Sequence, residues 1–166
     1  MNNTLKNKLI QIARDCYSSD DPSHDFGHIL RVLSNAENIA KEEKKADMDI
    51  LLPAVLFHDV INHPKNSPQA DSSSDESAIF AKKVLEDIDE YPRAKVSPVM
   101  YAISVCSFNK GIIPNTIEAK ILQDADGLEA TGAISIMRTF ASAGQMKTPF
   151  YHADDPFCKK KGTWFS

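Results

Sequence analysis

Apolar residues recur along the chain at the spacing of an α-helix. The first apolar stripe consists of Leu5, Leu9, Ile12 and Cys16. Residues at this spacing share one helix face, and the sequence Asp20-Asp21-Pro22 then interrupts the pattern. A second helix is predicted to begin near Ser23 or Asp25, since either side chain can cap it. The buried face predicted for this second helix contains Ile29, Val32, Leu33, Ala36, Ile39 and Ala40.

The third predicted helix, 47–60, has an entirely apolar stretch in its second half. Residues 54–57 are all apolar, so no face of the helix is left for solvent. A helix without a polar face is usually buried at the centre of a domain. The pair His58-Asp59 follows directly on this stretch, and two polar side chains at such a place require an explanation.

A capping box is predicted to open the fourth helix. Ser73 and Glu76 are three positions apart, as in the pattern where each side chain accepts the backbone N–H of the other residue. The apolar residues that this helix is predicted to bury are Ile79, Val84, Leu85 and Ile88.

The remaining helices are predicted between breaks at proline and glycine. One helix begins at 92 or 93 and ends near 108, and another, capped by Asn115 and Glu118, runs through 122. Helical character continues to about 140, and no segment has the alternation of a strand. We therefore predict an all-α fold of six or seven helices in one domain, 1–166. Its metal-binding core covers about 23–140, and an irregular tail covers 141–166.

The composition is typical of a single globular domain. The chain has 166 residues, of which 42% are hydrophobic and 25% charged, with a formal net charge of -4. This acidic balance argues against nucleic-acid polymers as partners, although a bound metal would still attract a phosphate. No apolar stretch approaches the ~18 residues of a membrane span, and the N-terminus lacks the pattern of a signal peptide. Because the three cysteines form no disulfide or metal pattern, we expect a cytoplasmic protein.

Histidine and aspartate interrupt three of the apolar segments. His24 and His28 are four residues apart and share a helix face. His58-Asp59 ends the most apolar helix, and Asp126 lies within the apolar stretch 121–128. A buried carboxylate is costly unless it is paired or coordinated, and one shared cation would satisfy all three segments. The alternative is a buried hydrogen-bond network among the same side chains.

The donor types narrow the choice of metal. Imidazole together with carboxylate favours manganese, iron, cobalt, nickel or zinc over calcium. An octahedral metal on two histidines and two aspartates would keep positions for a water and a phosphate oxygen. Asp124 and Asp126 are two residues apart on a helix and point in different directions, so we expect only one of them to bind the metal.

Three motifs together resemble the HD-domain phosphohydrolase superfamily. His28, the pair His58-Asp59 and the distant Asp126 match its H…HD…D signature, and their flanking residues are similar as well. Over roughly 23–158 the chain resembles the YedJ-like bacterial subgroup. The resemblance implies an all-helical HD domain that hydrolyses a phosphate ester or anhydride. The metal ligands that it implies are His28, His58, Asp59 and Asp126.

The resemblance also implies a substrate class and a cofactor. Nucleotides are typical substrates, for example a deoxynucleoside triphosphate cleaved to monophosphate and pyrophosphate. Manganese is the usual metal, with iron, cobalt, nickel, zinc and magnesium as alternatives. Cys106 stands where members of the subgroup often have histidine, and the chain ends at Ser166 where they continue. A catalytically inactive metal- and nucleotide-binding regulatory module, a purely structural helical domain and a homodimer therefore remain open.

Several further residues are candidates for catalysis or substrate binding. Asp59 is expected to act through the metal, and Glu76 is a candidate general base, although a capping role would explain it equally well. The residues predicted to contact the phosphates of the substrate are His24, Arg31, His63 and Lys65.

Overall fold

The computed structural model describes residues 1–17, 23–43, 45–64, 67–147 and 153–157. Within these ranges it has seven α-helices, several short 3₁₀ turns and no β-strand. The helices are α1 (Asn3–Cys16), α2 (Phe26–Glu43), α3 (Met48–Phe57), α4 (Ser73–Glu86), α5 (Val96–Ser104), α6 (Ile117–Gly127) and α7 (Gly132–Gln145). The prediction of an all-α fold with six or seven helices is confirmed.

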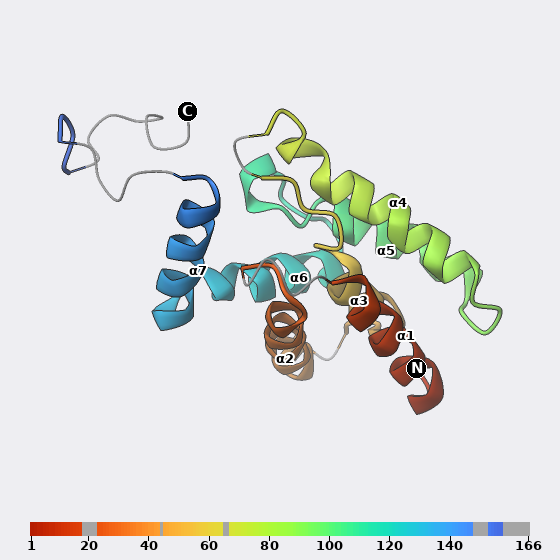
Figure 1. Cartoon of the computed structure of the whole chain (residues 1–166). Helices are drawn as coiled ribbons and strands as arrows, with labels where there is room; N and C mark the ends of the chain where they lie inside the picture. Colours follow the sequence, from red (N-terminus) through yellow and green to blue (C-terminus); the bar gives the residue numbers. More distant parts are fainter. Residues whose placement is uncertain (18–22, 44, 65–66, 148–152, 158–166) are drawn as a thin grey trace.

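Helix α3 is the centre of the packing. Every residue from Leu51 to Phe57 is buried, and the helix packs against α1, α2, α4, α5 and α6. Helices α4 and α5 lie side by side, α2 packs on α6, and α7 follows a short turn, Leu128–Ala130, at the end of α6 (Figure 1). Among the described helices, none is long and apolar enough to cross a membrane.

A proline inside α3 leaves one carbonyl of the helix without its usual partner. Pro53 has no N–H to donate to the carbonyl of Asp49, four residues earlier. The hydroxyl of Tyr91 donates to that carbonyl instead, at 2.7 Å. Tyr91 is 1% exposed and lies in the connection between α4 and α5. This connection therefore completes the hydrogen bonding of the central helix.

Replacing Tyr91 by Phe is expected to lower the free energy of unfolding by about 1–3 kcal/mol, because the Asp49 carbonyl then loses its donor. Urea unfolding of both proteins measures the difference. The matched control is Tyr101→Phe, since the Tyr101 hydroxyl only accepts an exposed bond from the Asn115 N–H, at 3.1 Å. If both variants lost the same stability, the bond to Asp49 would not be the reason.

The buried face of α4 differs from the predicted one. Ile79 was predicted to be buried and is 51% exposed, so this prediction is wrong. Leu85 and Ile88 are buried as predicted, while Val84 is only partly buried. The buried residues of α4 are mostly small, namely Ser74, Ser77, Ala78, Ala81 and Leu85. Small side chains allow α4 to lie close to α5, and the bulkier Ile79 projects beside that contact.

The capping box predicted for α4 is also wrong. The cap position is Ser72, and its side chain makes no cap hydrogen bond. The Ser73 hydroxyl instead accepts the backbone N–H of His63 at 3.1 Å, which ties the preceding loop to the start of α4. Glu76 accepts a hydrogen bond from the Ser72 hydroxyl rather than from a Ser73 backbone group.

The start of α6 and the end of α7 differ from the prediction as well. Thr116 caps α6 by accepting the N–H of Ala119 at 3.3 Å, instead of Asn115 or Glu118. Glu118 is buried and accepts the backbone N–H of Asp47, at the start of α3, at 2.9 Å. A side chain expected to stay local therefore joins two helices. Helix α7 continues to Gln145, past the predicted end near 140.

Candidate metal centre

Helix α2 places His28 in its first turn. Asp25 precedes the helix, and its Oδ1 accepts the backbone N–H of His28 at 2.8 Å, which is the bond of an N-cap residue. Asp25 is therefore the cap, and Ser23, the other predicted candidate, is not. The cap holds the first turn so that the His28 ring, 1% exposed, enters the interior.

The end of α3 orients the second histidine. The last carbonyls of a helix have no partner within it. The Val55 carbonyl accepts the Nδ1–H of His58 at 2.8 Å, and the Leu56 carbonyl accepts the hydroxyl of Tyr17 at 2.9 Å. When the His58 ring is neutral, the hydrogen on Nδ1 leaves a lone pair on Nε2. That atom is buried and has no hydrogen-bond partner among the described residues.

Two acidic residues reach His28 from the end of α6. Asp126 lies in the last turn of α6, and Glu129 follows three positions later in the short turn Leu128–Ala130. Asp126 Oδ1 lies 3.4 Å from Nε2 of His28 and 3.8 Å from Nε2 of His58. Glu129 Oε2 lies 3.3 Å from the other ring nitrogen of His28, Nδ1. Each nitrogen of His28 therefore faces a carboxylate.

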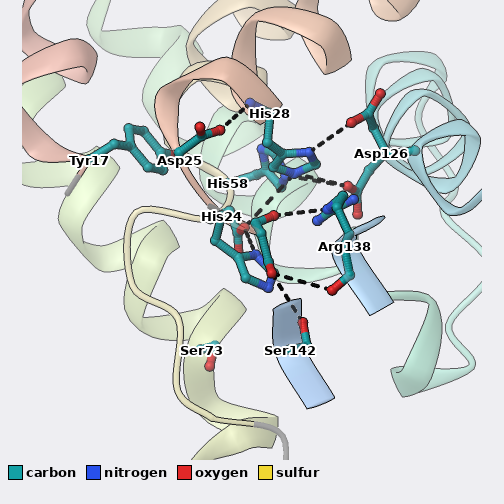
Figure 2. A network of polar contacts seen from close by, with 12 residues as sticks. Tyr17, His24, Asp25, His28, His58, Ser73, Asp126, Arg138 and Ser142 are labelled. Atoms are coloured by element: carbon teal, nitrogen blue, oxygen red, sulfur yellow. Dashed lines mark hydrogen bonds and ion pairs between the residues drawn. The ribbon is translucent and has the colours of Figure 1, made fainter. Parts of the chain in front are cut away.

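These residues form a compact group of nitrogen and oxygen donors. One ligand atom from each of His28, His58 and Asp59 lies within 4.8 Å of the other two. Asp126 faces both imidazoles from α6, as Figure 2 shows for its contact with His28. Side chains from α2, from the end of α3 and from α6 thus meet at one point. All four predicted ligands lie there.

The electrostatics of this donor group favour a cation at its centre. Burial would lower the pKa of His58, but the negative charges of Asp126 and Asp59 raise it to about 9. Burial would raise the pKa of Asp126, yet His28 and His58 hold it well below its usual range. Lone pairs on imidazole and carboxylate repel each other unless a proton or a metal lies between them. The donors could therefore hold a divalent transition metal.

His24 contacts the donor group through Asp59. Its Nδ1 lies 2.5 Å from Asp59 Oδ2, and the same oxygen is 3.9 Å from Nε2 of His28. A charge-assisted contact of this kind orients a ligand carboxylate. The residue before it, Ser23, is held by α7, because Nε of Arg138 donates to the Ser23 carbonyl at 2.9 Å (Figure 2).

The other predicted catalytic and substrate residues have different partners. Nε of Arg31 donates to Glu129 Oε2 at 2.8 Å. His63 Nε2 lies 3.2 Å from Glu76 Oε2, so these two predicted residues pair with each other beside the start of α4. Lys65 lies outside the described residues.

Cys106 is buried beside the acidic residues of the donor group, whereas Asp124 is exposed. Cys106 is 4% exposed, and burial raises the pKa of its thiol, as do the charges of Asp126 and Asp59. Asp124 is exposed, in keeping with the expectation that it and Asp126 point in different directions.

Three residues that were not selected from the sequence support the site: Tyr17, Glu129 and Arg138. Glu129 could have been found, because it follows Asp126 by only three positions. Tyr17 and Arg138 carry no such signal, since each donates to a backbone carbonyl in a distant segment.

Comparison with known proteins yields one family match and one curated relative. The family model of the HD domain matches residues 25–131. The protein YpgQ of Bacillus subtilis (strain 168) is 33% identical over 133 residues. This match covers 76% of the chain but only 60% of the length of YpgQ.

Solved structures with a similar fold come from several bacteria. A predicted HD superfamily hydrolase from an uncultured Thermotogales bacterium has a TM-score of 0.63 at 30% identity, covering 94% of this chain and 87% of its own. The structure of Bacillus subtilis YpgQ in complex with ADP has a TM-score of 0.64 at 27% identity. The match covers 92% of this chain and 72% of the YpgQ chain. A Lactobacillus plantarum protein has a TM-score of 0.72, covering 92% and 69%, but at 24% identity it shows the fold alone.

Proposed function

This chain belongs to the HD-domain family, and we propose that it is a metal-dependent phosphohydrolase that acts on a phosphate ester or anhydride of a nucleotide. The observation that carries the proposal is the buried donor group of His28, His58 and Asp59, with Asp126 facing both imidazoles. Nε2 of His58 is buried and has no hydrogen-bond partner in the described ranges. A nitrogen in this state is available to bind a metal.

His28, His58, Asp59 and Asp126 would hold one divalent metal, with manganese as the first candidate. When bound, such a metal polarises a phosphoryl oxygen and lowers the pKa of a water molecule. Asp59 and Asp126 supply the two negative charges that balance a divalent cation. His24 holds Asp59 in place through its Nδ1 contact at 2.5 Å.

Glu76 and His63 are the proposed proton acceptor and phosphate contact. Hydrogen bonds from Ser72 and His63 lower the pKa of Glu76, so its carboxylate is ionised at neutral pH and could accept a proton. His63 Nε2 lies 3.2 Å from that carboxylate. His63, with Lys65 two positions later in the sequence, would contribute donors to a phosphate group.

The proposed nucleotide class is supported by the complex of YpgQ with ADP. That structure shares the fold over 92% of this chain. A nucleoside phosphate offers phosphoryl oxygens to a metal and to basic side chains, which matches the proposed roles. Cleavage of a deoxynucleoside triphosphate to monophosphate and pyrophosphate is the reaction we propose to test first.

The test is hydrolysis of a panel of nucleotides and other phosphate esters by metal-stripped protein, with and without added Mn²⁺. We expect release of phosphate or pyrophosphate from one substrate class, and only with metal present. Isotopic content of the products from ¹⁸O-labelled water would confirm that hydrolysis occurred. A protein that binds Mn²⁺ and nucleotide but cleaves no substrate would contradict the proposed phosphohydrolase activity. That result would support the alternative of a metal- and nucleotide-binding regulatory module.

A further inference from the structure

We propose that Glu129 and Arg31 are positioning residues that orient the His28 ring so that its Nε2 can bind the metal. Glu129 would accept the Nδ1–H of His28, and Arg31 would balance the charge of Glu129. The inference rests on the proposed metal centre and adds to it two residues outside the set of four ligands.

The position of Glu129 gives Nδ1 of His28 a hydrogen-bond partner while Nε2 faces the proposed metal position. Glu129 is 7% exposed, and its Oε2 lies 2.8 Å from Nε of Arg31 and 3.3 Å from Nδ1 of His28. A carboxylate accepts hydrogen bonds, so a His28 ring that binds a metal through Nε2 would donate its Nδ1–H to Glu129. Nε2 is then left with its lone pair, and it is this atom that faces Asp126 at 3.4 Å and Asp59 at 3.9 Å.

Charge explains why Arg31 accompanies Glu129. A buried carboxylate without a counter-charge is costly and tends to take up a proton. Arg31 follows His28 by three positions on α2 and lies on the same helix face. Its side chain is 38% exposed and reaches Glu129 from the solvent side. Arg31 therefore supplies the counter-charge of the buried Glu129 carboxylate and holds its Oε2 beside Nδ1 of His28.

The two histidines are therefore oriented by different partners. His58 donates its Nδ1–H to a neutral backbone carbonyl, that of Val55, whereas His28 donates to a carboxylate. A carboxylate partner makes an imidazole a stronger donor to a metal, and loss of such a partner commonly weakens metal binding by about 10–100-fold. Metal affinity should depend on Glu129 even though it is not a ligand.

The contact also suggests a different role for Arg31 from the predicted one. Arg31 was predicted to contact the phosphates of the substrate, but its Nε donates to Glu129 Oε2 at 2.8 Å. A phosphate-binding arginine affects the KM of the substrate and leaves metal affinity in the absence of substrate unchanged. An arginine that acts through Glu129 changes metal affinity before any substrate is added.

The experiment is titration of the metal-free full chain with Mn²⁺ in the absence of nucleotide, with free Mn²⁺ followed by electron paramagnetic resonance. We expect Glu129→Gln to weaken Mn²⁺ binding by about 10–100-fold. Arg31→Gln should weaken it too, and Arg31→Gln added to Glu129→Gln should have no further effect, because both residues act through one contact. The absorption spectrum of bound Co²⁺ should shift in Glu129→Gln, since the donor strength of His28 changes.

The matched control is Glu118→Gln. Glu118 is as buried as Glu129, 8% against 7% exposed, and lies on α6, but its partner is the backbone N–H of Asp47. The same chemical change there should leave Mn²⁺ affinity and the Co²⁺ spectrum as in the wild type. Circular dichroism verifies that each variant is folded, and the half-exposed Arg31 offers a second variant if Glu129→Gln does not fold.

Three outcomes would contradict the proposal. Unchanged Mn²⁺ affinity in a folded Glu129→Gln would overturn the role of Glu129 while leaving the metal centre intact. Unchanged Mn²⁺ affinity in Arg31→Gln, together with a raised KM for the nucleotide, would overturn the role of Arg31. A wild-type protein that binds no Mn²⁺ would overturn the metal centre itself, and the inference with it.

Discussion

Replacing Asp126 by Ala is expected to abolish metal binding and hydrolysis together. Asp126 Oδ1 is 3.4 Å from His28 Nε2 and 3.8 Å from His58 Nε2, so its removal takes away the carboxylate that faces both imidazoles. The donor group also loses one of its two negative charges. Because a metal contributes several kcal/mol to the transition state, activity should fall by about 10³-fold or more. Metal content by mass spectrometry and the rate of hydrolysis measure the two effects.

Asp124→Ala is the matched control for this prediction. Asp124 lies on the same helix, two positions earlier, and its side chain is exposed. The same substitution there should leave metal content and activity within about twofold of the wild type, as for most surface changes. An Asp126→Ala protein that kept stoichiometric metal and full activity would refute the assignment of Asp126. Equal losses in both variants would show that the effect comes from α6 in general.

Replacing Phe57 by Ala is expected to give a large loss of stability. Phe57 is 0% exposed at the end of the central helix, and its ring centroid lies 6.2 Å from that of Phe80 on α4. Truncation of a buried phenylalanine leaves a cavity and costs about 3–5 kcal/mol. In a domain of this size each kcal/mol lowers the melting temperature by about 2–4 °C. Thermal and urea unfolding of the metal-free protein measure the change.

Phe108→Ala is the control for Phe57→Ala. Phe108 is 85% exposed, so the same truncation removes little buried surface and should change stability by about 0.5 kcal/mol or less. Saturating metal should restore part of the stability lost in Phe57→Ala, by about 2.7 kcal/mol at a hundredfold excess over Kd. Similar losses in the two variants would contradict the central place of Phe57 in the core.

The sequence by itself was enough to predict the class of fold and the four residues of the candidate metal site. Apolar residues at helical spacing predicted six or seven helices and no strand, because burial of one face requires that period. The unbroken apolar stretch 54–57 predicted that α3 is central, since no polar face remains for solvent. His58-Asp59 and Asp126 stood out because polar groups within apolar segments need a partner.

Only the tertiary structure decided which helix face meets which neighbour. A helical period shows that one face is apolar but does not show how large the side chains at a helix contact can be. Ile79 was therefore predicted to be buried, whereas small residues of α4 pack against α5. Partners of long polar side chains are equally undetermined, because several acceptors are within reach until the helices are packed. Glu118 was expected to stay on its own helix and instead reaches Asp47.

The four predicted ligands could be selected from the sequence, but the partners of the residues around them could not. A ligand is recognisable in sequence because its residue type and its apolar surroundings are local properties. The partners of Glu129, Arg31 and Tyr17 are not local, because each of these side chains contacts a segment distant in the sequence, and only the packing of the helices sets those distances. The four predicted ligands could therefore be selected from the sequence, whereas the hydrogen bonds that orient them depend on how the helices pack.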